Sequence, residues 1–551
     1  MLSDCNFELN SEEYTEFIFK DSYFANKYLE NLEDYCITRI NSKWSVISVR
    51  NSIIGPPSYE KFGYSVFPSI YGLADVGAIT ASGVIRIREQ PFLGLNGDGT
   101  CIAVIDTGIN WRHQAFINGG TTSKIKVLWD QEKNEIFDTD RINQALSGQN
   151  IDIPEDEIGH GTFMAGIACG NADSANSFSG VAPGAGLIVV KLKQAKRSLR
   201  DFYSVKQDVP AYSEVDIMRA IQFVSEYAES NGIHVSIVLG LGNSLGAHSG
   251  FSPLSDMLSD ESDIVGRCIT IAAGNEGNER LHYHGRVVNN NPAGVELRIG
   301  SNEEGVTANI WSKAPFQYSL EIVSPSGQIA GRIPVINESV RLNFLFENTT
   351  VFVYSRRYES LSGANLIAIR FKNPAEGIWT LNLYKNFDGA GEFDIWIINR
   401  SFITENTFFL ISDPSVTILD PGNLAKAITV SAYNYRDGSA YFKNSRGYNW
   451  YGYVKPDFAA PGVDIIVPSV FGNDGYVVRS GSSIAAAFFS GIAALLLEYG
   501  IVRDTIPYIR TSEIKSIIIS GCVRKDNIVY PNNIWGYGEV NLFNSFQRLR
   551  E

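Results

Sequence analysis

Cysteine, histidine and methionine are scarce in this sequence of 551 residues, which contains 6, 6 and 4 of them. The cysteines lie far apart and form no CxxC pair: Cys5, Cys36, Cys101, Cys169, Cys268 and Cys522. This spacing excludes a cysteine-based zinc site and a dense disulfide framework, so no metal centre is predicted. A reducing compartment is the simpler expectation.

Positive charge is also in short supply, with 46 Lys and Arg against 60 Asp and Glu and a formal net charge of −14. A surface with this balance repels phosphate backbones and anionic membranes, which excludes nucleic acid as a partner and a polybasic membrane anchor. The N-terminus lacks the basic and apolar regions of a signal peptide, so we expect synthesis in the cytoplasm. The most apolar stretch, residues 484–497, is too short to span a bilayer.

Hydrophobic residues make up 44% of the chain, which is enough for a large core and predicts about three or four domains. Residues 1–70 mix acidic helix-like segments with short alternating strands, which predicts a small α+β unit. From residue 100, continuous apolar runs alternate with helical segments. These runs are residues 101–105, 186–190, 234–239 and 268–273. Continuous apolar strands separated by helices predict an α/β fold with a parallel sheet covered on both faces.

Residues 281–415 break this alternation. They contain many short β-rich runs separated by turns with Gly, Pro and Asn, and helical periodicity is absent. This composition predicts an antiparallel β-sandwich inserted as a unit, because the α/β pattern resumes after residue 420.

Three short segments carry candidate chemistry. Asp106 directly follows a buried apolar strand, His160 opens a helix of small residues, and Ser483 opens a long apolar helix. Each is weak alone: Asp-Thr-Gly also marks aspartic proteases, a His before Gly often lies in a turn, and Ser before an apolar run is often a helix N-cap. Their joint presence in this order indicates a catalytic triad.

The chemistry of acyl transfer requires these residue types. A serine hydroxyl needs a base that takes its proton during attack, and His160 has a suitable ordinary pKa. A buried carboxylate at Asp106 would orient the imidazole and stabilise its charged form. Asn275, in a Gly-Asn-Glu-Gly segment after another buried strand, offers a side-chain amide for the oxyanion; alone, this segment would be interpreted as a turn.

The order and sequence of these motifs resemble the subtilisin-like serine proteases, over residues 75–280 and 416–545. The resemblance implies peptide-bond hydrolysis through an acyl-enzyme on Ser483, a protein or peptide substrate and no required cofactor. Structural calcium occurs in the family, but no motif here predicts it. The resemblance also assigns four substrate-binding residues: Gly240, Leu241, Gly242 and Gly274.

Three positions depart from the family pattern. Ser482 replaces the usual Thr before the nucleophile and keeps a hydroxyl, and Ala487 replaces a Pro. Gly240 replaces a Ser in the strand that pairs with substrate. This change preserves backbone pairing but predicts looser packing in this wall of the substrate site. None of these changes removes a catalytic group.

A narrower resemblance, to the Csp group of clostridial subtilases, rests on the β-rich insertion, the N-terminal segment and the residues Gly246 to Gly250. It implies that residues 1–74 are an inhibitory and chaperone propeptide, which we call the N-terminal segment. The enzyme would cut it near Leu73 and Ala74, and the cut propeptide would be able to remain bound. Residues 75–551 would form the catalytic domain, interrupted by a jelly roll at 281–415.

The Csp resemblance also implies a role in spore germination, where the best-known members cut the precursor of a cortex-degrading lytic enzyme. A protein of this kind would be incorporated into the spore near the cortex. Three alternatives stay open: a pseudoprotease that signals or binds with its propeptide retained, a structural spore-layer protein, and a clostridial subtilase with another substrate.

Other polar residues are assigned ordinary roles. His282 and His284 have no nearby carboxylate or cysteine cluster in the sequence, so we do not expect a metal site there. We expect His248 to be structural. The acidic loop from Asp152 to Glu157, upstream of His160, is interpreted as solvated.

Overall fold

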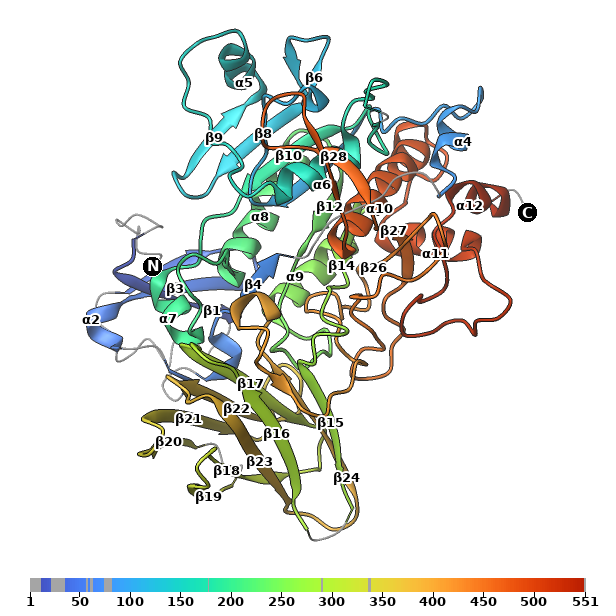
Figure 1. Cartoon of the computed structure of the whole chain (residues 1–551). Coiled ribbons are helices and arrows are strands. Elements are labelled where there is room, and N and C mark those ends of the chain that lie inside the picture. Colours follow the sequence, from blue (N-terminus) through green and yellow to red (C-terminus); the bar gives the residue numbers. More distant parts are fainter. Residues whose placement is uncertain are drawn as a thin grey trace.

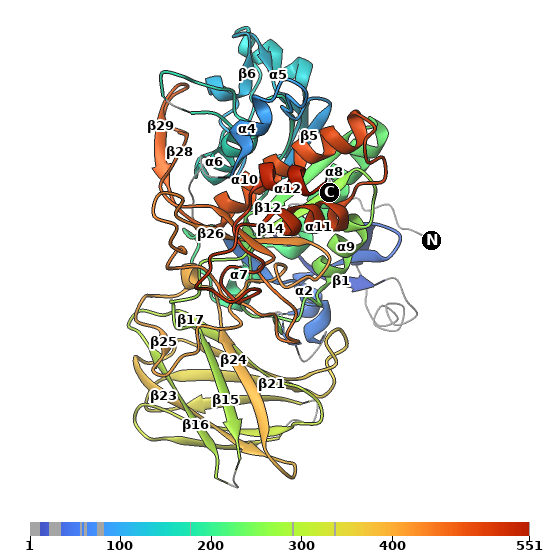
Figure 2. The same cartoon turned by 90° about the vertical axis from the view of Figure 1, so that its right-hand side faces the viewer.

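The structure is a computed structural model that describes residues 11–20, 35–55, 58–59, 63–73, 82–176, 178–288, 291–334 and 338–549. Figure 1 shows an N-terminal sheet, a parallel sheet covered by helices, which we call the α/β unit, and a β-sandwich. The sandwich forms one end of the molecule, and the parallel sheet with its helices lies beyond it (Figure 2).

The central sheet has eight strands in the order β27-β26-β14-β12-β5-β10-β8-β9. Neighbouring strands are parallel except for β8 and β9, which form an antiparallel pair at one edge. The strands are β5 (Thr100–Asp106), β8 (Ile125–Asp130), β9 (Glu135–Asp138), β10 (Gly186–Lys191), β12 (His234–Leu239), β14 (Arg267–Ala272), β26 (Ile428–Tyr433) and β27 (Phe458–Pro461). The predicted α/β fold class is therefore confirmed.

Helices cover both faces of this sheet, which explains why its inner strands contain continuous apolar runs. On one face lie α6 (His160–Cys169) and α10 (Ser482–Leu497), and on the other lie α8 (Glu214–Ser230) and α9 (Pro253–Ser262). The central strand β5 supplies alternate residues to the two hydrophobic clusters beneath these pairs of helices.

Shorter elements surround the sheet. They are α4 (Val84–Arg88), β6 (Ile117–Asn118), β7 (Thr122–Ser123), α5 (Thr139–Leu146), α7 (Arg197–Tyr203), β28 (Ile465–Pro468), β29 (Tyr476–Arg479), α11 (Thr511–Gly521) and α12 (Leu542–Arg548).

Helix α10 is the central core helix. Together with the π-helical turn Glu498–Val502 it makes a helical stretch of 21 residues, which is longer than the apolar run suggested. By length and composition it could cross a membrane, but 89% of its most apolar window is buried inside the protein. Burial of this kind is typical of the core helix of an α/β protein.

Two antiparallel sheets form the β-sandwich at the place in the chain where an insertion was expected. One sheet has the order β15 (His282–Val287), β24 (Gly391–Ile397), β17 (Gly305–Ser312), β22 (Asn365–Lys372), β21 (Thr349–Arg356), β20 (Ser339–Phe344). The other has the order β19 (Ile329–Ile333), β18 (Tyr318–Val323), β23 (Gly377–Lys385), β16 (Ala293–Ile299), β25 (Phe408–Phe409).

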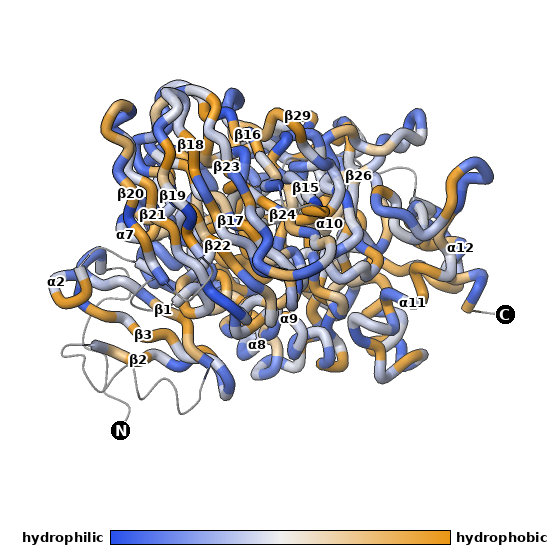
Figure 3. Tube along the Cα trace, turned by 90° about the horizontal axis from the view of Figure 1, so that it is seen from below, coloured by the Kyte–Doolittle hydropathy of each residue, from blue (hydrophilic) through white to orange (hydrophobic). Residues whose placement is uncertain are grey.

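Large aromatic residues fill the space between these two sheets. Trp379 of β23 packs edge-on against Phe344 and Phe371 of the opposite sheet, at ring-centre distances of 5.0 and 5.2 Å. Strand β21 alternates between buried and half-buried positions, as expected for a sheet with one face in a core. Figure 3 shows the matching alternation of hydrophobic and hydrophilic residues along the strands of the sandwich.

The N-terminal segment contributes a three-stranded antiparallel sheet with the order β1-β3-β2 and the short helix α2. Their bounds are β1 (Tyr14–Lys20), β2 (Tyr35–Arg39), β3 (Trp44–Arg50) and α2 (Asn51–Ile54). Ile18, Trp44 and Val46 belong to the same hydrophobic cluster as α8 and α9, so this sheet packs on the outer face of those helices.

After this sheet the chain enters the α/β unit as a strand. β4 (Ile70–Leu73) lies between β11 (Tyr212–Ser213) and β13 (Leu241–Gly242) and is antiparallel to both. Leu73 pairs with Leu241, and Gly72 pairs with Gly242. The N-terminal segment therefore pairs with the strand that was predicted to bind substrate.

Four cysteines of the α/β unit are free and buried: Cys101, Cys169, Cys268 and Cys522. Cys36, in β2, is disulfide-bonded, which the cysteine spacing did not predict.

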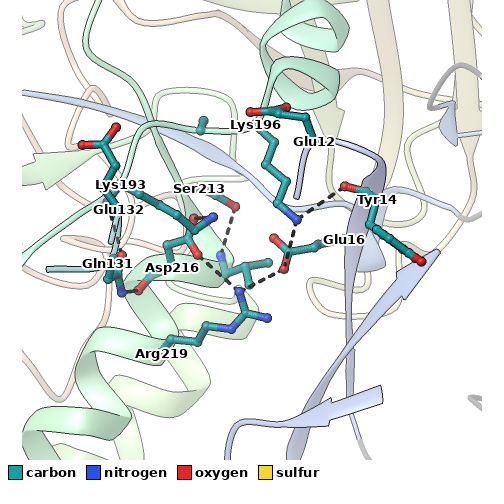
Figure 4. Close-up of polar contacts among 12 residues, drawn as sticks. Glu12, Tyr14, Glu16, Gln131, Glu132, Lys193, Lys196, Ser213, Asp216 and Arg219 are labelled. Carbon is teal, nitrogen blue, oxygen red and sulfur yellow. Dashed lines mark hydrogen bonds and ion pairs between the residues drawn. The ribbon is translucent and has the colours of Figure 1, made fainter. Parts of the chain in front are cut away.

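A buried group of charges joins β1 to the α/β unit. Glu16 lies 2.9 Å from Arg219 and 3.6 Å from Lys196, and Asp216 lies 2.9 Å from Lys193 and 3.4 Å from Arg219. Figure 4 shows Glu16 between the two cationic side chains. Burial disfavours the charged form of Glu16, but the positive charges of Arg219 and Lys196 outweigh it and lower the pKa of Glu16 to about 2.

Replacing Glu16 with Ala leaves Arg219 and Lys196 buried without this carboxylate, so we expect a loss of about 3–5 kcal/mol in the free energy of unfolding. Because the folded pKa is lowered, this stabilisation is complete above pH 4.5 and is lost as the pH falls toward 2. Urea denaturation of both proteins at pH 7 and at lower pH measures both effects.

The matched control is Glu13→Ala, because Glu13 is an exposed carboxylate that pairs with Arg50 at the surface. We expect this variant to unfold at the same urea concentration as the unchanged protein. Equal losses for the two variants would contradict a special role of the buried charges.

Candidate active site

The structure brings the three predicted triad residues together beside the carboxyl end of strand β5 in the central sheet. Asp106 is the last residue of β5, His160 is the first residue of α6, and Ser483 is the second residue of α10. His160 Nδ1 lies 2.8 and 2.9 Å from the two carboxylate oxygens of Asp106, and its Nε2 lies 3.1 Å from Ser483 Oγ. All three side chains are buried, with 5% exposure or less. This is the geometry of a serine nucleophile, its base and the carboxylate that orients the base.

Close backbone packing holds His160 against Asp106. Gly161 N donates to Thr107 Oγ1 at 2.9 Å, and Thr107 N donates to Asp106 Oδ1 at 2.7 Å. A Cβ at Gly161 would lie 2.2 Å from the Gly108 carbonyl oxygen, so only glycine fits at the start of this helix.

Asp156 fixes the start of the same helix. Its Oδ1 accepts from the Gly159 N–H at 2.7 Å, and its Oδ2 accepts from the N–H and the hydroxyl of Thr162 at 2.9 and 2.7 Å. Asp156 is buried, so the interpretation of this acidic loop as solvated is wrong for this residue. The signal that could have revealed it is a carboxylate four residues before His160 and a hydroxyl two residues after it.

Asn275 lies beside the nucleophile. Its Oδ1 accepts from Ser482 N at 3.1 Å, and the Ser482 hydroxyl accepts from Gly274 N at 3.0 Å. Because the first bond uses the amide oxygen, the NH2 group at the other end of the amide is the one that can reach a substrate carbonyl at Ser483. The hydroxyl that Ser482 keeps therefore links α10 to the backbone next to Asn275, the predicted oxyanion donor.

Gly240, Leu241 and Gly242, which were predicted to pair with substrate, border this centre. A Cβ at Gly240 would lie 2.5 Å from Met164 Sδ and 2.9 Å from His160 Cε1. Met164 thus fills the space that a larger residue would use, so the wall is close-packed here and the expectation of a looser wall is not met. Because β4 pairs with Leu241 and Gly242, this edge carries an added strand.

The other histidines serve the structure around the centre. Both ring nitrogens of His248 lie near backbone carbonyls, at 2.7 Å from Ile418 O and 3.0 Å from Ser244 O. His282 and His284 both contact Asp394, at 3.0 and 2.9 Å, a carboxylate that lies 112 and 110 positions away from them in the sequence. Within the described residues, no group of three or more His, Cys, Asp or Glu is arranged to hold a metal ion.

A parallel sheet that carries Asp, His and Ser on a strand end and two helix starts defines the class of subtilisin-like serine proteases. The model of the subtilase family matches residues 97–296 and 404–538, more than half of the chain. The protein therefore belongs to the subtilase family, whose members are serine endopeptidases of the subtilisin type.

Among solved structures, the Clostridium perfringens CspB protease is similar, with a TM-score of 0.77 and 28% identity over 85% of this chain and 96% of that chain. The predicted resemblance to the Csp group is thereby confirmed. Serine protease AprX of Bacillus subtilis (strain 168) is 34% identical over 151 residues, which are 24% of this chain and 32% of AprX. Bacillopeptidase F of the same organism is 34% identical over 99 residues, 18% of this chain and 6% of the relative. The chain thus spans a third or less of these two curated relatives.

Replacing Asn275 with Ala removes a donor that acts on the charge of the transition state, so we expect kcat to fall about 100- to 1,000-fold with little change in KM. Hydrolysis of a peptide substrate measures both constants. Asn278→Ala is the control, because Asn278 is an exposed amide three residues away that bonds to the Phe442 carbonyl. A large rise in KM for Asn275→Ala would instead indicate a ground-state binding role.

Proposed function

We propose that the protein is an endopeptidase that first cuts its own N-terminal segment and then hydrolyses protein substrates. The observation that carries this proposal is the position of β4, which pairs with β13 and ends beside the triad. Extended substrates add to a sheet edge in the same manner, through main-chain hydrogen bonds. The N-terminal segment thus lies where a substrate would.

The triad geometry supports the following reaction. Ser483 Oγ attacks the substrate carbonyl while His160 Nε2 takes its proton, and Asp106 stabilises the resulting imidazolium. The Asn275 amide and the N-terminus of α10 stabilise the oxyanion. His160 then protonates the leaving amine, and water hydrolyses the acyl-enzyme by the reverse sequence of proton transfers.

The register of β4 supports one position for the self-cleavage. Leu73 pairs with Leu241, so the next residue along an antiparallel pair would face Gly240, which adjoins His160. We therefore propose that the bond between Ala74 and Asp75 is cut, in agreement with the region predicted from the sequence. Ala74 lies outside the described residues.

The likeness to the Csp group supports a further proposal on the substrate. We propose that the protein is made in the cytoplasm, is carried into the spore and cuts the precursor of a cortex-degrading lytic enzyme during germination. Incubating such a precursor with the protein, and separately with a Ser483→Ala variant, tests this. A shortened precursor only with the intact triad supports the role, and an unchanged precursor contradicts it.

A pseudoprotease with a retained N-terminal segment is the second candidate. The observation in its favour is that β4 is held between two strands, β11 and β13, and so blocks the substrate edge. Such a protein would remain one chain and would act by binding. The self-cleavage experiment separates the two candidates.

We expect the unchanged protein to split between Ala74 and Asp75, and Ser483→Ala to stay a single chain, because Ser483 supplies the hydroxyl that lies 3.1 Å from His160 Nε2. Intact-mass analysis of the two purified proteins measures this. Ser480→Ala, which removes a nearby serine hydroxyl outside the triad, should be processed normally. A cut in Ser483→Ala would point to another protease, and two uncut proteins would favour the pseudoprotease.

A further inference from the structure

The side chain of Leu419 lies between the two walls of the substrate site. A Cβ at Gly242 would lie 2.5 Å from Leu419 Cβ, and a Cβ at Gly274 would lie 2.6 Å from Leu419 Cγ. Both glycines would also meet Leu419 Cδ1, at 2.8 and 2.9 Å. One leucine side chain therefore fills the space between the substrate-pairing strand and the oxyanion segment.

Backbone hydrogen bonds hold Leu419 in this position from both walls. Leu419 N donates to Ala273 O at 3.0 Å, one residue before Gly274. On the other side, Asp420 and Asn243 exchange two backbone bonds of 2.9 Å, one residue after Gly242. Leu419 is 4% exposed, so its side chain is packed inside the site and does not point into solvent.

The geometry of the proposed reaction directs one substrate side chain toward the space that Leu419 fills. The residue whose carbonyl is attacked, here called the acyl residue, must lie opposite Gly240 and present its carbonyl to Ser483 and Asn275. Its backbone runs along Gly240 to Gly242, and its carbonyl faces the segment that contains Gly274. Its side chain is therefore directed between these two segments, toward Leu419.

We propose that Leu419 makes this pocket shallow and restricts the acyl residue to small side chains such as Ala, Gly or Ser. The inference rests on the proposed endopeptidase function and specifies its substrate class. The chain itself carries a residue of this size, Ala74, at the position proposed for self-cleavage. A Phe or Leu acyl residue would have to displace the side chain of Leu419, whose backbone is bonded to Ala273 and whose neighbour Asp420 is bonded to Asn243.

The test compares the p-nitroanilides of Tyr-Gly-Leu-Ala and Tyr-Gly-Leu-Phe, which reproduce the sequence before the proposed cut. We expect kcat/KM of the unchanged protein to be about 100-fold higher for the Ala substrate. Leu419→Ala should raise kcat/KM for the Phe substrate at least about 10-fold, because the pocket deepens. Hydrolysis of the Ala substrate by the variant reports that it is folded.

Leu424→Ala is the matched control, because Leu424 is a buried leucine on the same segment that packs in the cluster of α8 and α9. It should leave the ratio between the two substrates unchanged. A preference of the unchanged protein for Phe, or an unaltered ratio in Leu419→Ala, would overturn the proposal. Because the readout is a ratio within one preparation, incomplete self-cleavage lowers both rates and leaves the ratio intact. Failure of the proposed self-cleavage is seen separately, as an uncut chain.

A second variant tests the pocket without altering Leu419. Ala74→Phe places a large side chain at the self-cleavage position, and we expect at least a 10-fold slower cut than in the unchanged protein. Adding Leu419→Ala should restore the cut. Processing of Ala74→Phe between residues 74 and 75 at the unchanged rate would overturn the proposal.

Discussion

The contact between His160 and Ser483 is the constraint on which the rest of the structure depends. These residues are 323 positions apart in the chain, yet their side chains must meet at 3.1 Å. Each stands in the first turn of a helix, so two helices must start at one edge of the sheet and lie close together. Small residues make this approach feasible: a Cβ at Gly161 or at Gly491 would strike a neighbouring carbonyl oxygen, that of Ala168 in the second case. The small-residue composition of both helices follows from this requirement.

The β-sandwich is connected to the substrate site through a chain of contacts. Trp396 of β24 stacks between the rings of His248 and His282, at 4.3 and 4.7 Å, and its Nε1 donates to Val416 O at 2.8 Å. His248 in turn bonds to the carbonyl of Ile418, the residue before Leu419. The β-sandwich therefore supports the segment that carries Leu419, at the point where the chain returns to the α/β unit. Such packing favours a rigid site, which is what pre-organised catalysis requires.

The sequence was sufficient to predict the α/β fold and to single out Asp106, His160 and Ser483, which the structure places in contact, because both depend on local patterns. A continuous apolar run before Asp106 and an apolar helix after Ser483 are visible without coordinates. The roles of Asp156 and Leu419 were missed. They arise from contacts with residues that are far away in the chain, or whose spacing does not follow a helix or strand pattern. The looser wall expected at Gly240 failed for the same reason, because the neighbour that fills the space is Met164 on another element.

Under the proposed function, the N-terminal segment would have two roles that place opposite demands on binding. As a substrate it must present a backbone to the triad, and β4 does so through only a few main-chain pairs. As an inhibitor it must stay after the bond is cut, and the contacts that achieve this lie elsewhere. The buried pairs of Glu16 with Arg219 and Lys196, and the apolar face that includes Trp44, are untouched by a cut near residue 74. Cleavage would therefore change the covalent link but almost none of the docking energy, so the bound strand would persist until the sheet itself is removed.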